Sequence, residues 1–141
     1  MKLFDTTLDR LQASLDVRLA RQNVLGGNLA NADTPGYQPR ELDFEAAMKA
    51  RTTALVSGKP SLPSAMPVEG HLSLNVSQPE PDEPSSFVKV ADSPGGLDGN
   101  GVDLDRTMVE LSRNALLYGA STRSAGKKLS ILRYVASEGV G

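Results

Sequence analysis

Glycine and proline are distributed unevenly along the 141-residue chain, and this distribution limits which segments can form long helices. Residues 1–25 contain neither, and residues 103–138 contain no proline and only two glycines. Seven of the nine prolines and six of the thirteen glycines lie in residues 57–101. Both residue types interrupt helices, because proline lacks a backbone donor and glycine has a large conformational entropy to lose. The pattern predicts two long terminal helices separated by an irregular middle segment.

The C-terminal segment has a sustained apolar repeat. From Leu104 to Ala136, apolar side chains recur at alternating spacings of four and three residues, with Thr122 as the polar exception. That spacing is typical of coiled coils. The predicted seam on this helix consists of Leu104, Met108, Leu111, Ala115, Tyr118, Thr122, Ala125, Leu129 and Leu132. Asp103 is the expected N-cap, because its carboxylate can accept hydrogen bonds from the first helical amides.

The N-terminal segment repeats this pattern less regularly over an expected helix at residues 6–32. Its seam residues are Leu8, Leu11, Leu15, Leu25 and Leu29, and the series is interrupted at Arg18 and Gln22. Packing the terminal helices as a coiled coil would bring their seams together, in parallel or antiparallel orientation. Gly119 and Gly126 lie on one helix face and are expected to allow close approach of a neighbouring helix. The alternative is that they are incidental glycines of a surface helix.

The expected fold class is mainly α, with two long terminal helices packed as a coiled coil. The chain divides into an N-terminal core helix (1–33), a signature turn with a short helix (34–57), a Pro/Gly-rich irregular segment (58–101) and a C-terminal core helix (102–141). The short helix is expected at residues 42–56. Residues 71–76 and 87–90 alternate like short strands, which leaves room for a small β-hairpin.

Composition excludes several classes of function. A net charge of −2 gives no general attraction to nucleic acid or anionic membranes. The absence of cysteine excludes disulfides, thiolate nucleophiles and Cys-based metal sites. The one histidine, His71, lies in the loop-rich middle, and no serine sits in a Gly-x-Ser-x-Gly elbow. We therefore expect no enzyme, and no catalytic residue, cofactor, metal or small-molecule substrate. A carboxylate enzyme using Asp98, Asp103 and Asp105 is the remaining catalytic alternative.

The acidic stretch at residues 98–105 also invites comparison with a calcium loop. An EF-hand loop that begins at Asp98 needs glycine at its sixth position and glutamate at its twelfth. This chain has Asp103 and Val109 there. The stretch is better interpreted as a Gly-rich turn that leads into an acidic helix N-terminus.

One motif carries a resemblance to a known family. It begins at Asn28 and reads Asn-Leu-Ala-Asn-Ala-Asp-Thr-Pro-Gly-Tyr. Its signature residues are Asn28, Leu29, Ala30, Asn31, Thr34, Pro35, Gly36 and Tyr37. Taken alone, the motif is a helix end followed by a Pro-Gly turn. At this distance from an N-terminal heptad helix, it closely resembles the signature of bacterial flagellar axial proteins, which are the rod and hook subunits.

A second motif narrows the resemblance to the FlgB-like branch of that family. Its signature residues are Asn100, Val102, Asp103, Leu104 and Asp105. The run at residues 22–25 and the Asp43-Phe44 pair are also similar to that branch. The branch often has threonine where this chain has Gly101. FlgC-like proteins share the first motif and rank second. The resemblance covers both terminal thirds and fades over residues 57–97.

The resemblance implies a structural subunit of the proximal rod, which assembles through its terminal helices, transmits torque and surrounds the export channel. Implied partners are copies of itself, FlgC-like and FliE-like proteins, further rod subunits and the inner-membrane ring, without nucleic acid. The implied location is the basal body in the periplasmic space. We expect export without a cleaved signal peptide and no transmembrane segment, because no apolar stretch approaches ~20 residues. A soluble coiled-coil adaptor or export chaperone is the alternative from another class.

Overall fold

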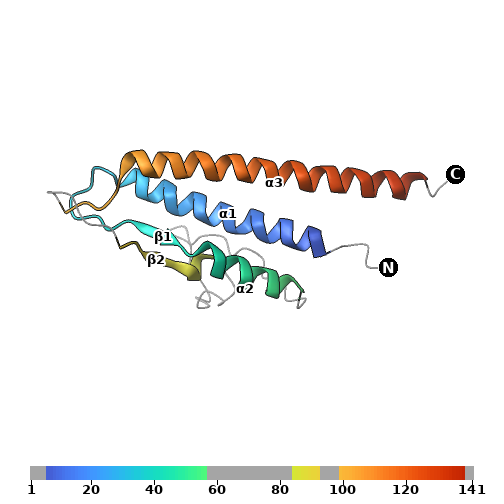
Figure 1. Cartoon of the computed structure of the whole chain (residues 1–141), viewed down its shortest axis with the longest axis horizontal. Coiled ribbons are helices and arrows are strands. Elements are labelled where there is room, and N and C mark those ends of the chain that lie inside the picture. The colour runs from blue at the N-terminus through green and yellow to red at the C-terminus, as the bar shows by residue number, and fades with distance from the viewer. Residues whose placement is uncertain (1–5, 57–83, 93–98, 139–141) are drawn as a thin grey trace, which may run out of the picture.

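The computed structural model of the chain describes residues 6–56, 84–92 and 99–138. Its longest elements are the helices α1 (Thr6–Ala30) and α3 (Leu104–Glu138). They lie side by side and run antiparallel, so that the start of α1 and the end of α3 lie at the same end of the molecule (Figure 1). The expected mainly α fold with two long terminal helices is confirmed. The orientation of the pair, which the sequence pattern left open, is antiparallel.

The smaller elements cover the face of α1 that is turned away from α3 (Figure 1). They are β1 (Arg40–Leu42), α2 (Phe44–Val56), the short 3₁₀ helix η1 (Pro84–Phe87) and β2 (Val88–Val90). The expected short helix therefore begins two residues late, because Leu42 belongs to β1. Asp43 caps α2 instead, since its Oδ1 accepts a hydrogen bond from the Ala46 amide at 3.1 Å.

β1 and β2 form a two-stranded antiparallel sheet in which Glu41 lies opposite Lys89. The strand predicted at residues 87–90 is present over Val88–Val90, because Phe87 belongs to η1, and its partner β1 was not predicted. The other predicted strand, residues 71–76, lies outside the described residues, so a hairpin with it stays a prediction. The small sheet joins the end of the signature turn to a segment almost fifty residues further along the chain.

The hydrophobic core is small and lies between α1, α2 and the sheet. Its buried members are Val17, Leu42 and Ala47, packed against the partly buried Ala20, Phe44, Met48, Phe87 and Val88. Within the described residues, Val17 is the largest side chain that is fully buried. An ion pair between the buried Arg51 and the half-buried Asp16 adds to this contact. Arg51 donates from Nε and Nη2 to the Asp16 carboxylate, each at 2.8 Å. The helix α3 contributes no residue to this core.

Shortening Val17 tests this description of the core. We expect Val17→Ala to lower the free energy of unfolding by about 2 kcal/mol, because it leaves a cavity between α1 and α2. Leu19→Ala is the matched control, since Leu19 lies on the same helix and is 52% exposed. Urea unfolding followed by circular dichroism measures both, and equal losses in the two variants would contradict the assignment of the core.

Candidate functional site

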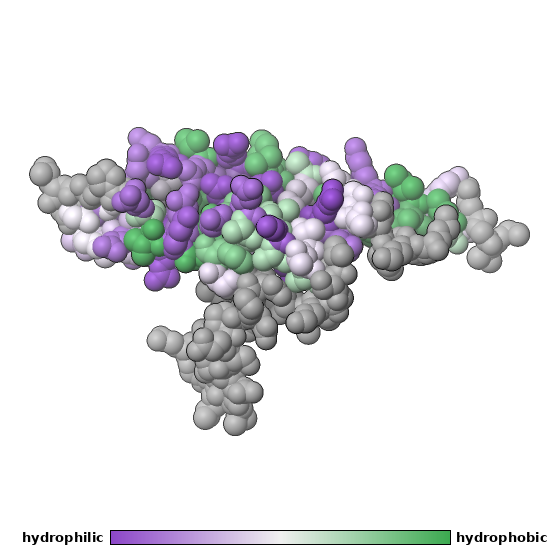
Figure 2. Space-filling model, turned by 60° about the horizontal axis from the view of Figure 1, so that its bottom comes forward, coloured by the Kyte–Doolittle hydropathy of each residue, from purple (hydrophilic) through white to green (hydrophobic). Residues whose placement is uncertain are grey.

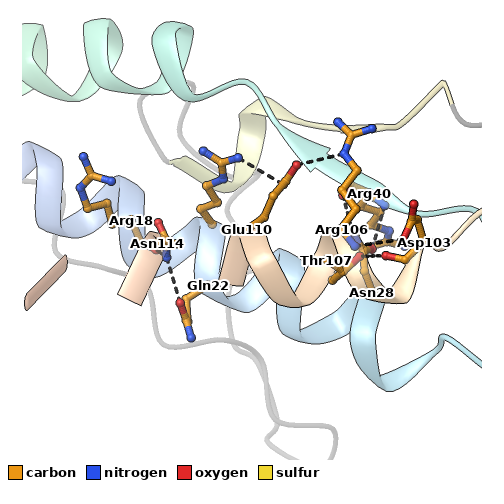
Figure 3. Close-up of polar contacts among 10 residues, drawn as sticks. Arg18, Gln22, Asn28, Arg40, Asp103, Arg106, Thr107, Glu110 and Asn114 are labelled. Carbon is orange, nitrogen blue, oxygen red and sulfur yellow. Dashed lines mark hydrogen bonds and ion pairs between the residues drawn. The ribbon is translucent and has the colours of Figure 1, made fainter. Parts of the chain in front are cut away.

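The side chain of Asn28 holds the chain that follows α1 against the end of that helix. It is 5% exposed, and its Nδ2 donates to the Arg40 carbonyl oxygen at 2.7 Å. Its Oδ1 accepts from the Arg40 amide at 2.9 Å and from the Tyr37 hydroxyl at 3.3 Å. The amide group therefore satisfies both main-chain groups of Arg40, as a neighbouring strand would (Figure 3). Only a side chain with a donor and an acceptor can do this.

Between Asn28 and Arg40 the chain reverses through a tight turn. The Tyr37 amide donates to the Thr34 carbonyl oxygen at 3.2 Å. Pro35 follows Thr34, and Gly36 has a φ of 72°. A proline followed by a residue with positive φ defines a type II turn, in which glycine avoids the steric penalty of that conformation. The Thr-Pro-Gly-Tyr sequence of the first signature therefore encodes one specific turn.

The second signature docks on this turn through Asn100. The Asn100 side chain is 8% exposed, and its Nδ2 lies within hydrogen-bonding distance of three carbonyl oxygens. These belong to Asn31 (3.2 Å), Ala32 (2.6 Å) and Thr34 (2.9 Å). Its Oδ1 accepts from the Val102 amide at 2.8 Å. The two signatures, about seventy residues apart in the sequence, thus form one structure, which we call the turn clamp: residues 28–40 and 99–103.

Glycine is favoured by its backbone conformation where the two halves of the clamp meet. Gly99 has a φ of 75°, and a Cβ atom there would lie 3.6 Å from the Gly36 Cα. The neighbouring Gly101 amide donates to the Tyr37 carbonyl oxygen at 3.1 Å. Backbone therefore packs directly on backbone at this point.

The helix α3 starts immediately after the clamp. Asp103 is its N-cap, as predicted, because its Oδ1 accepts from the Arg106 amide at 2.9 Å. The Thr107 hydroxyl donates to the Asp103 carbonyl oxygen at 2.6 Å. The cap and the clamp together fix the direction in which α3 leaves the turn.

Along the helix pair, α1 and α3 meet through polar side chains. Asn114 is 3% exposed and donates from Nδ2 to the Arg18 carbonyl oxygen and to Gln22 Oε1, both at 2.9 Å (Figure 3). Its Oδ1 is buried and has no hydrogen-bond partner. Nearby, Glu110 bridges two guanidinium groups, those of Arg21 at 3.3 Å and Arg106 at 3.2 Å.

These polar contacts were not predicted, because Arg18 and Gln22 were interpreted as interruptions of an apolar seam. A polar repeat on α3 does indicate them. Thr107, Asn114 and Ser121 recur every seven residues beside the apolar repeat, and all three are buried or half-buried. A polar heptad position of this kind is known to fix the register of paired helices.

The guanidinium group of Arg18, on α1, lies against the start of α2. Its Cζ lies 5.1 Å from the centre of the Phe44 ring, and its Nε donates to the Ser14 hydroxyl at 3.2 Å. Burial lowers the pKa of Arg18, and the nearby charges of Arg21 and Arg113 lower it further. The group still carries its charge at neutral pH, because arginine is protonated there even after a sizeable shift.

The predicted seam residues are covered on α1 but mostly exposed on α3. On α1, Leu25 is buried, and Leu8, Leu11, Leu15 and Leu29 are half-buried. On α3, Leu111, Ala125 and Leu132 are half-buried, whereas Leu104, Met108, Ala115, Tyr118, Thr122 and Leu129 are exposed. In the single chain, the covered side of α3 therefore mixes polar residues such as Thr107 and Asn114 with apolar ones such as Leu111, and most of the apolar seam is left exposed. That this seam packs against other subunits stays a prediction.

The helical glycines are not required for packing within the chain. A Cβ atom at Gly119 would meet only the Arg123 side chain of the same helix, at 3.7 Å, and one at Gly126 would meet nothing within 4 Å. Their expected role in close packing concerns contacts between subunits, and it stays a prediction.

Nothing in the described part of the chain suggests a ligand site. No group of three or more potential metal-binding side chains occurs among the described residues. A hollow of about 120 Å³ lies beside Arg21, Asn28 and Arg40. It is smaller than the ~300 Å³ at which ligand pockets typically begin. A second hollow of about 320 Å³, beside Tyr37, Val90 and Gly99, lies only at the lower end of that range. The described helices also include none with the length and apolar character needed to cross a membrane. His71 lies outside the described residues.

Comparison with known proteins decides the family. Residues 7–38, which cover all of α1 but Thr6 and the whole of the first signature, match the family model described as "Flagella basal body rod protein". The chain is 34% identical to the flagellar basal body rod protein FlgB of Salmonella typhimurium, over 96% of both chains. It is 32% identical to FlgB of Escherichia coli over the same share, and 27% identical to FlgB of Bacillus subtilis over 99% of both chains.

This chain belongs to the FlgB family of flagellar basal body rod proteins. The resemblance inferred from the two signatures is thereby confirmed, and so is the assignment to a structural protein rather than an enzyme. In this FlgB-family member, the two signatures are the two halves of the turn clamp.

Replacing Asn28 tests the clamp. We expect Asn28→Asp to lower the free energy of unfolding by about 1–3 kcal/mol, because the carboxylate cannot donate to the Arg40 carbonyl oxygen and is repelled by it. Asn23→Asp makes the same chemical change at an exposed position of the same helix and should have little effect. Urea unfolding compares the two variants, and a clamp that contributes nothing would leave them equally stable.

Proposed function

We propose that this FlgB-family subunit occupies the proximal part of the rod, where its terminal helices transmit torque and surround the export channel. The observation that carries the proposal is the uncovered apolar seam of α3. Met108 and Leu129 are each 52% exposed, although they belong to a heptad repeat that runs the length of a 35-residue helix. A long apolar row on an otherwise polar helix usually marks a surface for partner helices.

The geometry of the helix pair supports a mechanical role. The clamp fixes one end of the pair, and the Asn114 and Glu110 contacts fix its middle. A helix of this length extends for roughly 50 Å, because each residue adds 1.5 Å. A stiff antiparallel pair that is held at defined points can pass a load along its axis without changing register. Seams on several neighbouring pairs would then close into a tube.

The proposed partners are copies of this chain, FlgC-like and FliE-like proteins, further rod subunits and the inner-membrane ring. The proposed location is the periplasmic space, reached through the flagellar export apparatus without a cleaved signal peptide. Two features support this route. The chain contains no cysteine, so no disulfide has to form or break on the way. Its core is small, so little packing has to be undone before export.

A charge placed in the seam tests the proposed function. We expect Met108→Glu to abolish swimming and the formation of complete basal bodies, because it buries a carboxylate between helices. Ser124→Glu is the matched control, since this exposed position lies about 160° away around α3. Motility in soft agar, export of the subunit and isolation of basal bodies measure the effect.

The interpretation depends on export and folding being retained. Circular dichroism should show the same helicity for both variants, because neither position contributes to the core. Normal motility and normal basal bodies in the Met108→Glu strain would contradict the assignment of the seam to subunit contacts.

A further inference from the structure

The C-terminal part of α3 extends past the described part of α1 (Figure 1). The contacts of Glu110 with Arg21 and of Asn114 with Arg18 set the register of the antiparallel pair. Each step along α1 corresponds to one step back along α3, so Thr6 lies opposite about residue 126. We call residues 127–137 of α3 the overhang. No described residue of α1 lies opposite it.

The overhang combines apolar surface with positive charge. More than half of the surface of Leu129, Ile131, Tyr134 and Val135 is exposed. Lys127 and Arg133 are also exposed. Figure 2 shows apolar surface at this end of the molecule beside hydrophilic surface. Four large apolar side chains within seven residues form a denser group than the scattered apolar residues of an ordinary protein surface.

The opposite end of the molecule, which carries the turn clamp, has the complementary chemistry. Exposed carboxylates surround it, namely Asp33, Glu41, Asp92, Asp103 and Asp105. Exposed apolar side chains lie among them, because Leu104 is 48% and Val90 is 57% exposed. Three exposed cations lie at this end. Arg106 is paired with Glu110 and Lys89 with Asp43, which leaves Arg40 against the five carboxylates. The two ends of the molecule therefore carry opposite charge beside apolar surface.

We propose that the overhang docks on the clamp end of the axially adjacent rod subunit. The partner surface is an acidic clamp end of the kind this chain itself presents, with carboxylates around exposed aliphatic side chains. The inference rests on the proposed function, because it requires neighbours along the rod axis. A contact between opposite ends of similar subunits is heterologous. Repeating such a contact adds subunits one after another along an axis, whereas an isologous contact closes a dimer. The cations of the overhang orient the contact, and its apolar side chains exclude water from it.

The charge pattern also explains why the clamp end fits better than a lipid surface. A basic amphipathic helix can bind anionic membrane. The overhang is short, however, and its exposed apolar side chains project in several directions, with Ile131 and Leu129 about 160° apart around the helix. A membrane surface can contact only one side of a helix. The clamp end of a neighbouring subunit, which lies between a turn and the start of a helix, can contact the overhang from several sides.

Photo-cross-linking in assembled basal bodies tests the contact directly. The photoreactive residue p-benzoylphenylalanine replaces Val135 in the full-length chain, and the cross-linked peptide is identified by mass spectrometry. We expect it to come from the clamp end of a rod subunit, close to the Thr-Pro-Gly turn or the acidic start of its C-terminal helix. A cross-link to residues 1–5 of this chain, to a helix flank, to the membrane ring or to lipid would overturn the proposal.

Charge reversal separates this proposal from the proposed function. The double variant Lys127→Glu/Arg133→Glu should reduce the yield of basal bodies about tenfold, because it sets like charges against each other across the contact. The matched control Lys49→Glu/Arg113→Glu reverses two exposed cations away from the overhang and should assemble normally. Reversing carboxylates at the cross-linked clamp end should restore assembly of the overhang variant.

The outcomes distinguish the two ideas. If the overhang variant assembles normally while Met108→Glu does not, the end-to-end contact is wrong and the rod function stands. If both variants assemble normally, the rod function proposed for these helices fails as well.

Discussion

The amide of Asn100 is the group on which the arrangement of this chain depends most. It is surrounded by three carbonyl oxygens of the turn that follows α1, while its own oxygen holds the start of the segment that leads into α3. Each of these hydrogen bonds is worth about 0.5–1.5 kcal/mol, and losing the Asn100 donor removes all three at once. The second signature therefore stabilises the shape of the turn. The side-chain amide of Asn28 plays the same part on the other side of the turn, where it forms two hydrogen bonds with the main chain of Arg40.

A polar clamp suits a chain whose hydrophobic core is too small to orient its longest helix. The core joins α1, α2 and the sheet around Val17, and α3 takes no part in it. Asn114, Glu110 and their partners make directional polar contacts between α1 and α3, and these fix the register of the pair. Most of the apolar seam of α3 is exposed in the single chain. The helix is thus held in place within the subunit, while its seam stays open for the subunit contacts proposed above.

The sequence predicted the large features because they rest on local rules. Long helices follow from the absence of proline, and the cap at Asp103 follows from a carboxylate placed before an apolar repeat. The β1–β2 pairing was missed because strands of three residues are too short to show a period, and their partners are far apart in the chain. The Asn114 contact was not predicted, because only the apolar positions of the heptad repeat were assigned to the helix contact, and Asn114 lies beside them. Resemblance pointed to both signatures, but only the three-dimensional structure showed that Asn28 and Asn100 act on the same turn.

We propose that the isolated subunit is ordered at its clamp, whereas the apolar seam of α3 is covered only when neighbouring subunits pack against it. Hydrogen–deuterium exchange of the isolated chain and of assembled basal bodies tests it most directly. In the isolated chain, the amides of Tyr37, Arg40 and Gly101 should exchange slowly, and those of residues 127–137 should exchange fastest within α3. Assembly should slow exchange along the seam and the overhang while the clamp changes little. Slow exchange along the whole of α3 in the isolated chain, unchanged in the basal body, would contradict the account.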